Sequence, residues 1–422
     1  MTTAAYLAFE TADDEAARQV AAELERNGWQ VTRSGPELRA PDQLATLVQT
    51  VGDAAVVIVL ASQAAQESAW IQREVAAALN NGRPIIGLQA DDLPTESWFH
   101  STRDTRALID LRSGAQSEKL AKIVDQARAA GGRGRVIAML NIKGGVGKTV
   151  LAANLFAAAH LADKRSVSFI DLDPQHNLTQ YFLSPGERNR IRDRNHTIYN
   201  ILNPHGDAST PREDFGAIAV PLNRARGKRP NFELVAGDER LFEFTLDTRS
   251  DRDKAEAFTR FRALVSALRA RSDAVVIDAN PCATFLTRLA ITCADHIIAP
   301  VRPEKYSLTG LNMLEHVVRE VRGRTLRPGD FSVLLNGVND RTRSSETGDA
   351  DTLTRNELQQ APFFGSALLP VEIPYSAVLR SAPSDRFAAN PINVTAMMRV
   401  GGRPAKEALA GAAAAILRRA AA

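Results

Sequence analysis

A short glycine-rich stretch, 141-NIKGGVGKTVL-151, contains the first residues whose types and spacing suggest chemistry. It follows the apolar run 136–140 and precedes a helical pattern over 148–162, which is the context of a phosphate-binding loop. In such a loop Lys148 neutralises the β- and γ-phosphates and the Thr149 hydroxyl binds Mg²⁺. Backbone N–H groups surround the anion, and here they belong to Gly144, Gly145, Val146, Gly147, Lys148, Thr149 and Val150. The stretch therefore predicts a nucleotide site.

The loop is a variant of the usual pattern G-x-x-x-x-G-K-[ST]. Ile142 stands where that pattern has its first glycine, and Lys143 adds a second lysine within the loop. Because Lys148 already accounts for phosphate binding, Lys143 needs an explanation of its own.

Three aspartates follow apolar runs that are typical of buried strands. The segment 169-FIDLDPQHNLTQ-180 places Asp171 and Asp173 two residues apart, and 273-DAVVIDANPCATF-285 ends its apolar run at Asp278. The carboxyl ends of parallel strands meet at one edge of a sheet, where ligands bind. Carboxylates there could ligate Mg²⁺ or orient a water molecule beside the phosphate loop.

The order N-x-K-G-G-V-G-K-T resembles the deviant Walker A motif of the ParA/MinD family of ATPases, and similar segments continue to about residue 392. In that family the extra lysine reaches phosphates bound by the other subunit. The resemblance thus implies that Lys143 is a catalytic contact in an ATP-sandwich homodimer. It also implies that Asp171 arranges the metal site, Asp173 positions or activates the attacking water, and Asp278 binds Mg²⁺ through water. Asn336, which ends the apolar run 331–336, would face the base of ATP.

Two positions depart from the family pattern. Asn280 stands where family members usually have proline, which leaves the rate of hydrolysis open, and Val150 stands where they often have threonine. Several relatives bind DNA nonspecifically through basic C-terminal residues, and a ParB-like or other protein could activate hydrolysis. The corresponding candidates for DNA contacts are Arg341, Arg343, Arg380, Arg386, Arg399 and Arg403.

The first 130 residues resemble a TIR domain. The opening 8–31, the strand and helix over 55–79, and the next strand within 80–89 match its pattern, although Glu10 replaces the usual serine. Trp70 and Glu74 are four residues apart on the predicted helix and so share a face. In TIR domains that hydrolyse NAD⁺ the glutamate at this position is catalytic, because a carboxylate beside the ribose stabilises the charge that develops as nicotinamide leaves. A scaffold without chemistry is the alternative.

Alternating strand and helix patterns must position these residues. They predict two α/β domains: a flavodoxin-like TIR domain with a parallel sheet over 1–130, a linker over 131–135, and a larger P-loop NTPase domain with a mostly parallel, doubly wound sheet over 136–422. The polar segment 184–230 is interpreted as an irregular excursion. The alanine-rich 405–422 predicts a C-terminal packing helix, with a membrane-surface helix as the alternative.

Charge is unevenly distributed along the chain. Residues 1–130 contain 12 Lys and Arg against 18 Asp and Glu, whereas residues 131–422 contain 40 against 31. A basic second part is compatible with a nucleic-acid partner or with an ordinary solvated surface. The acidic start and the absence of a long apolar run predict a cytoplasmic protein without a membrane span.

Two functions compete at this stage. The first is an ATPase whose nucleotide-dependent dimer, or a higher oligomer, gates a TIR domain that hydrolyses NAD⁺ in signalling or defence. The second is a partition or positioning ATPase whose TIR domain only recruits a partner. A third, minor option is an ATP-binding scaffold with hydrolysis impaired by Asn280.

Overall fold

The computed structural model describes residues 3–35, 39–81, 83–93, 97–101, 109–112, 119, 123, 134–203, 215–222, 231–246, 249–280, 284–304, 307–338, 350–375 and 402–421. Contacts divide the chain into two compact units, Met1–Arg133 with Arg319–Thr325, and Gly134–Val318 with Leu326–Ala422. We keep 1–130, 131–135 and 136–422 as the proposed limits of the domains and linker.

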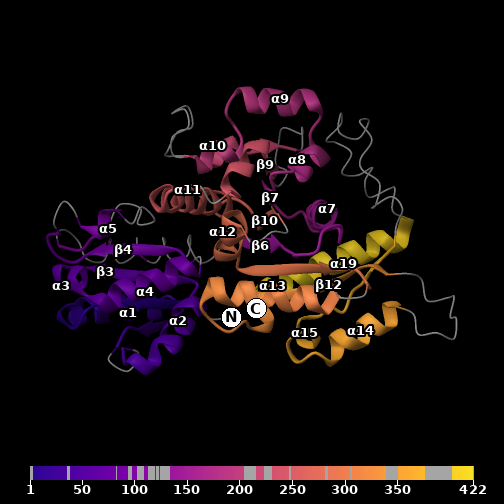
Figure 1. Ribbon diagram of the computed structural model, residues 1–422. Coiled ribbons are helices and arrows are strands. Elements are labelled where there is room, and N and C mark those ends of the chain that lie inside the picture. Colours follow the sequence, from indigo (N-terminus) through magenta and orange to yellow (C-terminus); the bar gives the residue numbers. More distant parts are fainter. Residues whose placement is uncertain are drawn as a thin grey trace. The chain divides into compact units, whose positions relative to one another are not determined.

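The first unit contains a parallel sheet with the order β2-β1-β3-β4-β5 among its described strands (Figure 1). The strands are β1 (Thr3–Ala8), β2 (Trp29–Arg33), β3 (Val56–Ala61), β4 (Ile85–Gln89) and β5 (Ile109–Asp110). The helices are α1 (Asp14–Arg26), α2 (Leu44–Asp53), α3 (Gln63–Glu67), α4 (Ala69–Asn80) and α5 (Trp98–Ser101).

Both faces of this sheet are covered. On α1 the buried residues recur at helical spacing, Ala17, Val20, Ala21 and Leu24, and pack in one core with the sheet. Residues of α2 and α4 pack in a second core, which contains other side chains of β1 and β3. All positions of β3 are buried, as expected for a central parallel strand between two helical layers. The predicted flavodoxin-like α/β arrangement is confirmed.

The second unit contains a larger sheet with the order β13-β12-β11-β6-β10-β7-β9-β8 in the described residues, and only the edge pair β8–β9 is antiparallel there. The strands are β6 (Arg135–Met139), β7 (Val167–Leu172), β8 (Val220–Pro221), β9 (Phe232–Val235), β10 (Ala274–Ala279), β11 (His296–Val301), β12 (Phe331–Val338) and β13 (Ile373–Pro374). This is the predicted mostly parallel, doubly wound sheet.

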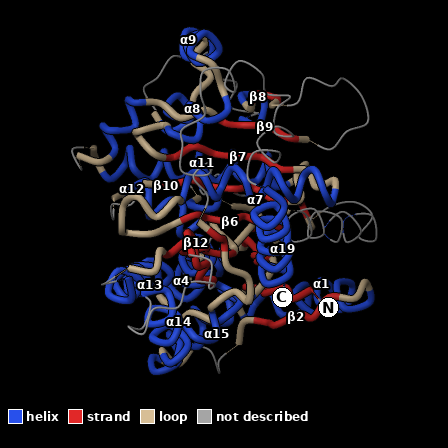
Figure 2. Tube along the Cα trace, turned by 90° about the vertical axis from the view of Figure 1, so that its right-hand side faces the viewer, coloured by secondary structure: helices blue, strands red, loops and turns tan. Residues whose placement is uncertain are grey.

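Helices lie on either side of that sheet (Figure 2). The described helices that follow β6 are α7 (Lys148–Asp163), α8 (Asn177–Phe182), α9 (Pro185–Asp193), α10 (Ile198–Leu202), α11 (Asp251–Arg269), α12 (Phe285–Cys293), α13 (Ser307–Arg322), α14 (Ala350–Gln360), α15 (Pro362–Ala367) and α19 (Gly402–Ala421). Among the described helices, we find none with the length and apolar character that crossing a membrane requires.

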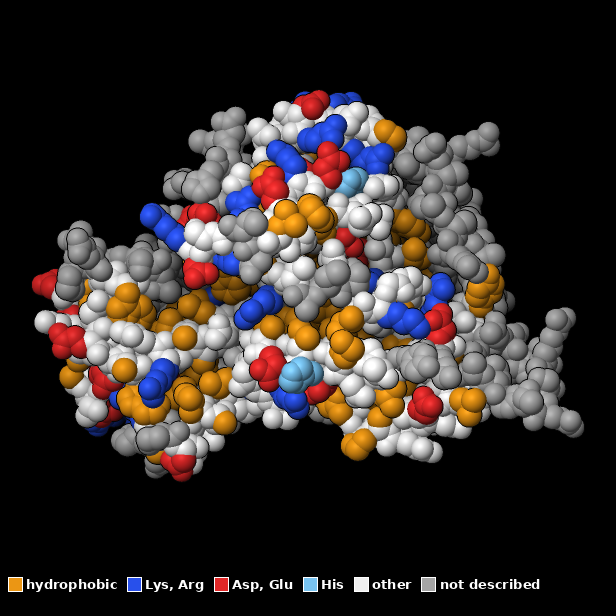
Figure 3. Space-filling model, in the orientation of Figure 1, with side chains coloured by type: hydrophobic (Ala, Val, Ile, Leu, Met, Phe, Trp, Pro, Cys, Tyr) orange, Lys and Arg blue, Asp and Glu red, His pale blue; other side chains and the backbone are white. Residues whose placement is uncertain are grey.

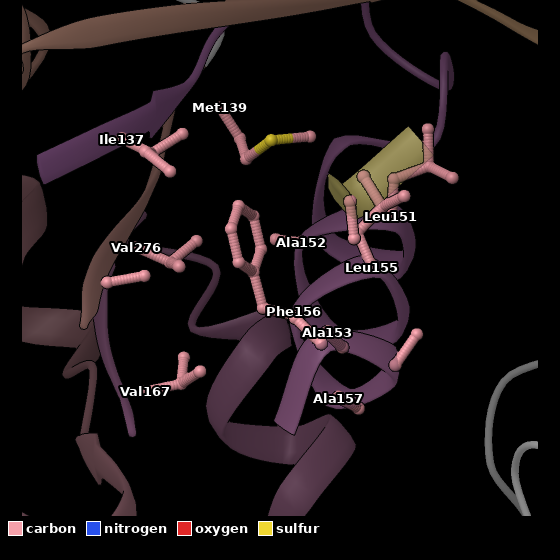
Figure 4. Close-up of a cluster of buried hydrophobic side chains, with 14 of the residues drawn as sticks. Ile137, Met139, Leu151, Ala152, Ala153, Leu155, Phe156, Ala157, Val167 and Val276 are labelled. Atoms are coloured by element: carbon pink, nitrogen blue, oxygen red, sulfur yellow. The ribbon is translucent and has the colours of Figure 1, made fainter. Parts of the chain in front are cut away.

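The core beneath α7 shows how the phosphate loop is anchored. Phe156 projects from α7 between Met139 of β6 and Val276 of β10 (Figure 4), and it is fully buried. The helix is apolar on nearly all sides because α19 covers its other face with Ala412, Ala413 and Ile416. The predicted C-terminal packing helix is therefore confirmed.

One part of the sequence-based interpretation was wrong. The segment that begins at residue 184 was read as irregular, but it contains α9 and α10. Helix α9 starts with a capping box, in which the Ser184 hydroxyl accepts from the Glu187 N–H and the Glu187 carboxylate accepts from the Ser184 N–H. Pro185 occupies the first helical turn. The capping box and the proline are visible in the sequence. A helix with no buried residue, however, lacks the apolar periodicity on which the interpretation relied.

Candidate functional site

The glycine-rich loop joins β6 to α7 at the carboxyl edge of the large sheet. Gly145 and Gly147 have φ angles of 74° and 93°, a region that side chains disfavour, and Gly147 caps the N-terminus of α7. The backbone thereby turns sharply enough to direct its N–H groups outward from the helix start. Lys148 is the first residue of α7 and is largely buried.

The second lysine forms an ion pair with a residue of the same chain. The Lys143 ammonium lies 2.5 Å from the Glu304 carboxylate, and both side chains are partly exposed. Asn141 fixes the start of the loop, because its amide nitrogen donates to the Pro300 carbonyl at 2.6 Å and its oxygen accepts from the Lys143 N–H at 2.9 Å. The loop and the end of β11 are thus tied together, and Lys143 is available at the surface.

A pocket of about 720 Å³ opens in front of the loop. That volume is within the range of sites for small molecules and cofactors. Its walls come from the loop, the ends of β7, β10, β11, β12 and β13, and the segments that follow them. The lining residues are Gly144, Gly145, Gly147, Lys148, Thr149, Val150, Leu151, Asp173, Gln175, Asn177, Asn280, Arg302, Asn336, Gly337, Pro374 and Tyr375.

Asp278 meets the requirements of a cation ligand. It is 1% exposed, and neither carboxylate oxygen accepts a hydrogen bond of normal geometry from the described residues. Burial raises the pKa of Asp278 to about 7, against the opposing effects of the nearby Thr149 hydroxyl and Lys148 ammonium. A buried carboxylate that lacks hydrogen bonds of normal geometry is costly, and a hard divalent cation would satisfy it. Thr149 and Asp278 therefore fit Mg²⁺.

Asp173 and Asp171 have different surroundings. Asp173 lines the pocket and accepts from the Gln175 N–H at 2.9 Å. Asp171 is fully buried and accepts from the N–H and hydroxyl of Thr179 at 2.7 and 2.6 Å. The Thr179 hydroxyl in turn accepts from the Gly237 N–H at 2.7 Å. Asp171 thus ties β7 to helix α8 and, through Thr179, to the segment that follows β9, and it is not among the residues that line the pocket.

Two buried carboxylates lie side by side in this region, because Asp171 pairs in register with Asp278 on the neighbouring strand. Burial, followed by the charge of Asp278, raises the pKa of Asp171 to about 8. The two groups therefore disfavour simultaneous ionisation unless positive charge enters the site.

Asn336 lies against the phosphate loop. Its amide nitrogen donates to the Val146 carbonyl at 2.8 Å, so the end of β12 supports the loop directly. Asn336 also lines the pocket, where it was predicted to face a base. Sequence reasoning missed Arg302 and Tyr375, which directly follow β11 and β13. The rule that ligands bind at the carboxyl ends of parallel strands could have identified both.

We expect Gly147→Ala to weaken nucleotide binding by about tenfold or more while the chain stays folded. A methyl group at Gly147 would lie 2.6 Å from the Asn336 amide nitrogen, and the φ angle of 93° would be strained. Titration with a fluorescent ATP analogue measures the change. Gly186→Ala is the matched control, because a methyl group there meets nothing within 4 Å. Equal affinities of the two variants would contradict this account of the loop.

In the first unit Glu74 lies in a polar interior rather than on an open surface. Its side chain is fully buried, and Oε1 accepts from the Ser34 hydroxyl at 2.6 Å and the Tyr6 hydroxyl at 3.1 Å. Oε2 has no hydrogen-bond partner among the described residues. Burial raises the pKa of Glu74 to about 7, although Ser34, Arg39 and Tyr6 act in the opposite direction.

Trp70 has different surroundings from Glu74. Its ring is partly exposed and carries the Arg73 guanidinium 4.6 Å from the ring centre, outside the network around Glu74. The two candidates of the first unit therefore lie on one helix, but the structure brings only Glu74 into a polar cluster.

Two separate family models match the chain, one in its first part and one in its second. Residues 6–124 match the family model of a TIR domain, and residues 134–328 match that of an AAA domain. Over 253 residues the chain is 30% identical to an uncharacterized protein of Pseudomonas putida, covering 59% of this chain and 84% of that one. It is also 30% identical over 194 residues to the sporulation initiation inhibitor protein Soj of Bacillus subtilis, covering 45% and 66%. The chain belongs to the ParA/Soj family of ATPases and carries an N-terminal TIR domain. Both predicted family resemblances are confirmed.

Two further matches are proteins named for chromosome or plasmid partition. The chromosome partitioning protein ParA of Myxococcus xanthus is 32% identical over 194 residues, covering 45% of this chain and 59% of that one. A plasmid partition protein of Borrelia burgdorferi, solved with AMPPNP, is 20% identical with a TM-score of 0.44, covering 63% of this chain and 98% of that one.

The predicted DNA contacts are mostly outside the described residues. This applies to Arg341, Arg343, Arg380, Arg386 and Arg399. Arg403 is at the start of α19, but its side chain is not described.

Proposed function

We propose that the ParA-type domain binds and hydrolyses ATP with Mg²⁺, that ATP drives dimerisation, and that this dimer switches on NAD⁺ hydrolysis by the TIR domain. The observation that carries the first part is the pocket in front of the phosphate loop, which is lined by Lys148, Thr149 and Asp173. The buried Asp278 lies close to the same three side chains. Lys148 would bind the terminal phosphates and Asp173 would orient a water molecule. Thr149 and Asp278 would hold Mg²⁺, which supplies charge neutralisation at the phosphates.

The proposed dimer gives Lys143 its role. In one protomer its ammonium is paired with Glu304 at the surface. A partly exposed ion pair of this kind contributes little to stability, so Lys143 can exchange it for the phosphates of a second protomer at low cost. ATP-bound protomers would then face each other, and each lysine would complete the other's site.

The TIR domain supplies the proposed output. One carboxylate oxygen of Glu74 is buried and has no hydrogen-bond partner in the part of the chain that the structure describes, and such a group can bind ribose hydroxyls and stabilise positive charge. The TIR domains of NAD⁺-cleaving relatives act when they self-associate, as the resemblance implies. An ATP-dependent dimer provides that proximity, so ATP and NAD⁺ chemistry would be coupled. Both nucleotides are abundant in the cytoplasm, where we propose the protein works.

Nicotinamide release from NAD⁺ tests the proposal directly. The full-length protein is incubated with NAD⁺ alone, with ATP and Mg²⁺, and with ADP and Mg²⁺. We expect release with ATP to exceed that with ADP by about tenfold or more. If NAD⁺ stays intact in all conditions and the Glu74→Ala protein behaves identically in cells, the TIR domain is not an NADase.

The alternative is a partition or positioning ATPase whose TIR domain recruits a partner. Its support comes from relatives such as the chromosome partitioning protein ParA of Myxococcus xanthus. A ParB-like protein could then stimulate hydrolysis. In the view of Figure 3, basic side chains gather with some acidic ones around α9, which includes Arg190 and Arg192 in its last turn. This mixed surface does not by itself favour nucleic acid.

Salt-sensitive DNA binding that requires ATP and is lost in Lys143→Ala, together with intact NAD⁺, would establish the alternative. Stable ATP-bound dimers that release phosphate slowly or not at all would instead indicate a scaffold. In that case Asn280, which lines the pocket, is the residue to revert to proline.

A further inference from the structure

The buried Glu74 lies close to a second charged residue of the TIR domain. Arg39 places Nε 3.9 Å from Glu74 Oε1, and its own side chain is 15% exposed. One terminal nitrogen of Arg39 donates to the Phe9 carbonyl at 2.7 Å and to the Ser34 hydroxyl at 3.0 Å. Ser34 therefore contacts both Arg39 and Glu74, so the guanidinium and the carboxylate belong to one network.

The other terminal nitrogen of Arg39 binds Glu10. It lies 3.0 Å from each of the two Glu10 carboxylate oxygens. Glu10 also accepts from the hydroxyl of Ser68, which caps the helix α4 that carries Glu74. Burial acts to raise the pKa of Glu10, but the hydrogen bonds from Ser68 and Arg39 outweigh it and hold the pKa below its ordinary value. Glu10 is thus an anion bound to Arg39.

We propose that Arg39 is the anion-binding residue of the TIR site and that Glu10 occupies it until the diphosphate of a dinucleotide takes its place. A guanidinium binds carboxylates and phosphates with the same paired N–H groups, so one anion can replace the other. This inference rests on the proposed function of the TIR domain and adds the regulation of its site.

Replacement of Glu10 by a diphosphate is favourable because Arg39 keeps an anionic partner throughout. Leaving a largely buried guanidinium unpaired would be expensive, whereas replacing a carboxylate by a phosphate keeps the charge neutralised. The Glu10 side chain is 19% exposed, so it has a route to solvent once displaced. Its departure leaves Arg39 paired with the diphosphate, while the Arg39 Nε stays within 3.9 Å of Glu74 Oε1, so the bound dinucleotide would lie close to Glu74.

The guanidinium of Arg39 has incomplete hydrogen bonding, which supports its assignment as a ligand-binding residue. Its Nε is buried and has no hydrogen-bond partner among the described residues, although the remainder of the guanidinium is fully engaged. Glu74 Oε2 is likewise buried without a partner there. Two unsatisfied groups in one network are uncommon in a folded protein, and they mark the position where a polar ligand would bind.

The test measures NAD⁺ binding to the full-length protein in a Glu74→Gln background, with the phosphate loop saturated by AMPPNP and Mg²⁺. We expect Glu10→Gln to tighten NAD⁺ binding by about fivefold or more, since it removes the internal competitor. Arg39→Gln should weaken binding by about tenfold or more. Glu23→Gln is the matched control, because Glu23 pairs with Arg26 on the surface of the same domain.

Three results would overturn the proposal. The first is unchanged or weaker NAD⁺ binding in Glu10→Gln. The second is an equal gain for nicotinamide riboside, which has no phosphate. The third, should Glu10→Gln fail to fold, is unchanged binding in Ser68→Ala, which removes the hydrogen bond from Ser68 to Glu10 together with the cap that accepts from the Ile71 N–H.

Measuring NAD⁺ cleavage with the chain that retains Glu74 distinguishes a failure of this proposal from a failure of the proposed function. Tighter binding in Glu10→Gln without any NAD⁺ cleavage would support the anion site and overturn the NADase. Cleavage that is unaffected by Glu10→Gln, with unchanged binding, would overturn the anion site alone.

Discussion

Lys143→Ala is expected to leave ATP binding by the single protomer nearly unchanged and to weaken ATP-dependent dimerisation by about a hundredfold. In the protomer Lys143 contacts Glu304 at the surface and is not among the residues that line the pocket. In the proposed dimer it would contact buried phosphates, and loss of such a charged contact costs about 2–5 kcal/mol. Sedimentation velocity with AMPPNP and Mg²⁺ measures the association, and titration with a fluorescent ATP analogue measures the affinity of the protomer.

Glu304 provides the control for this experiment. Glu304→Gln removes the carboxylate that holds Lys143 at 2.5 Å but leaves the lysine in place. We therefore expect dimerisation to be equal to that of the unmodified chain or a few-fold stronger. If Lys143→Ala dimerises normally with AMPPNP, or loses ATP affinity in the protomer as severely as Lys148→Ala, Lys143 does not act across an interface.

Glu74→Gln is expected to lower NAD⁺ hydrolysis by about a hundredfold or more, while making the TIR domain more stable above pH 7. The pKa of Glu74 is raised from 4.5 to about 7 by burial, so the folded state prefers the protonated carboxyl. The unfolded chain is already ionised between pH 4.5 and 7 and binds fewer protons than the folded chain there. The stability that Glu74 contributes is therefore present at low pH and is lost as the pH rises towards 7.

The size of the stability difference follows from the pKa values of Glu74 in the unfolded and folded chain. The difference between 4.5 and about 7 corresponds to about 3 kcal/mol, which glutamine avoids because it is neutral. Thermal unfolding of the full-length protein and the variant, compared at pH 5 and pH 8, measures it. We expect equal melting temperatures at pH 5 and a higher one for Glu74→Gln at pH 8. Glu25→Gln, on the exposed side of α1, should show no such difference.

The combination of results distinguishes a catalytic from a structural role. A variant that is more stable yet inactive has lost chemistry rather than folding. If Glu74→Gln is less stable at pH 8, or if it still cleaves NAD⁺ at the original rate, Glu74 is not a buried catalytic carboxylate.

Local sequence was sufficient for the fold and for much of the nucleotide site. The apolar runs that end at Asp278 and Asn336 are buried parallel strands, and the rule on carboxyl ends places their last residues near the phosphate loop. The glycines of the loop have the positive φ angles that its pattern implies. These features depend on neighbours in the chain, which is why the sequence shows them.

Contacts between residues that are far apart in the sequence could not be predicted in the same way. Lys143 and Glu304 are 161 residues apart, and Glu10 and Arg39 are 29 apart, so no spacing rule connects them. The full burial of Glu74 was equally inaccessible, because a glutamate on an amphipathic helix is usually solvated. Only the tertiary structure shows that Tyr6 and Ser34 hydrogen-bond its carboxylate inside the domain.

The packing of α19 on α7 determines when the ATPase domain can finish folding during synthesis. Helix α7 carries the phosphate loop at its start, but one of its faces remains uncovered until residues 402–421 have been synthesised. The TIR domain has its own two cores and emerges first. The proposed effector is therefore made before its regulator is complete.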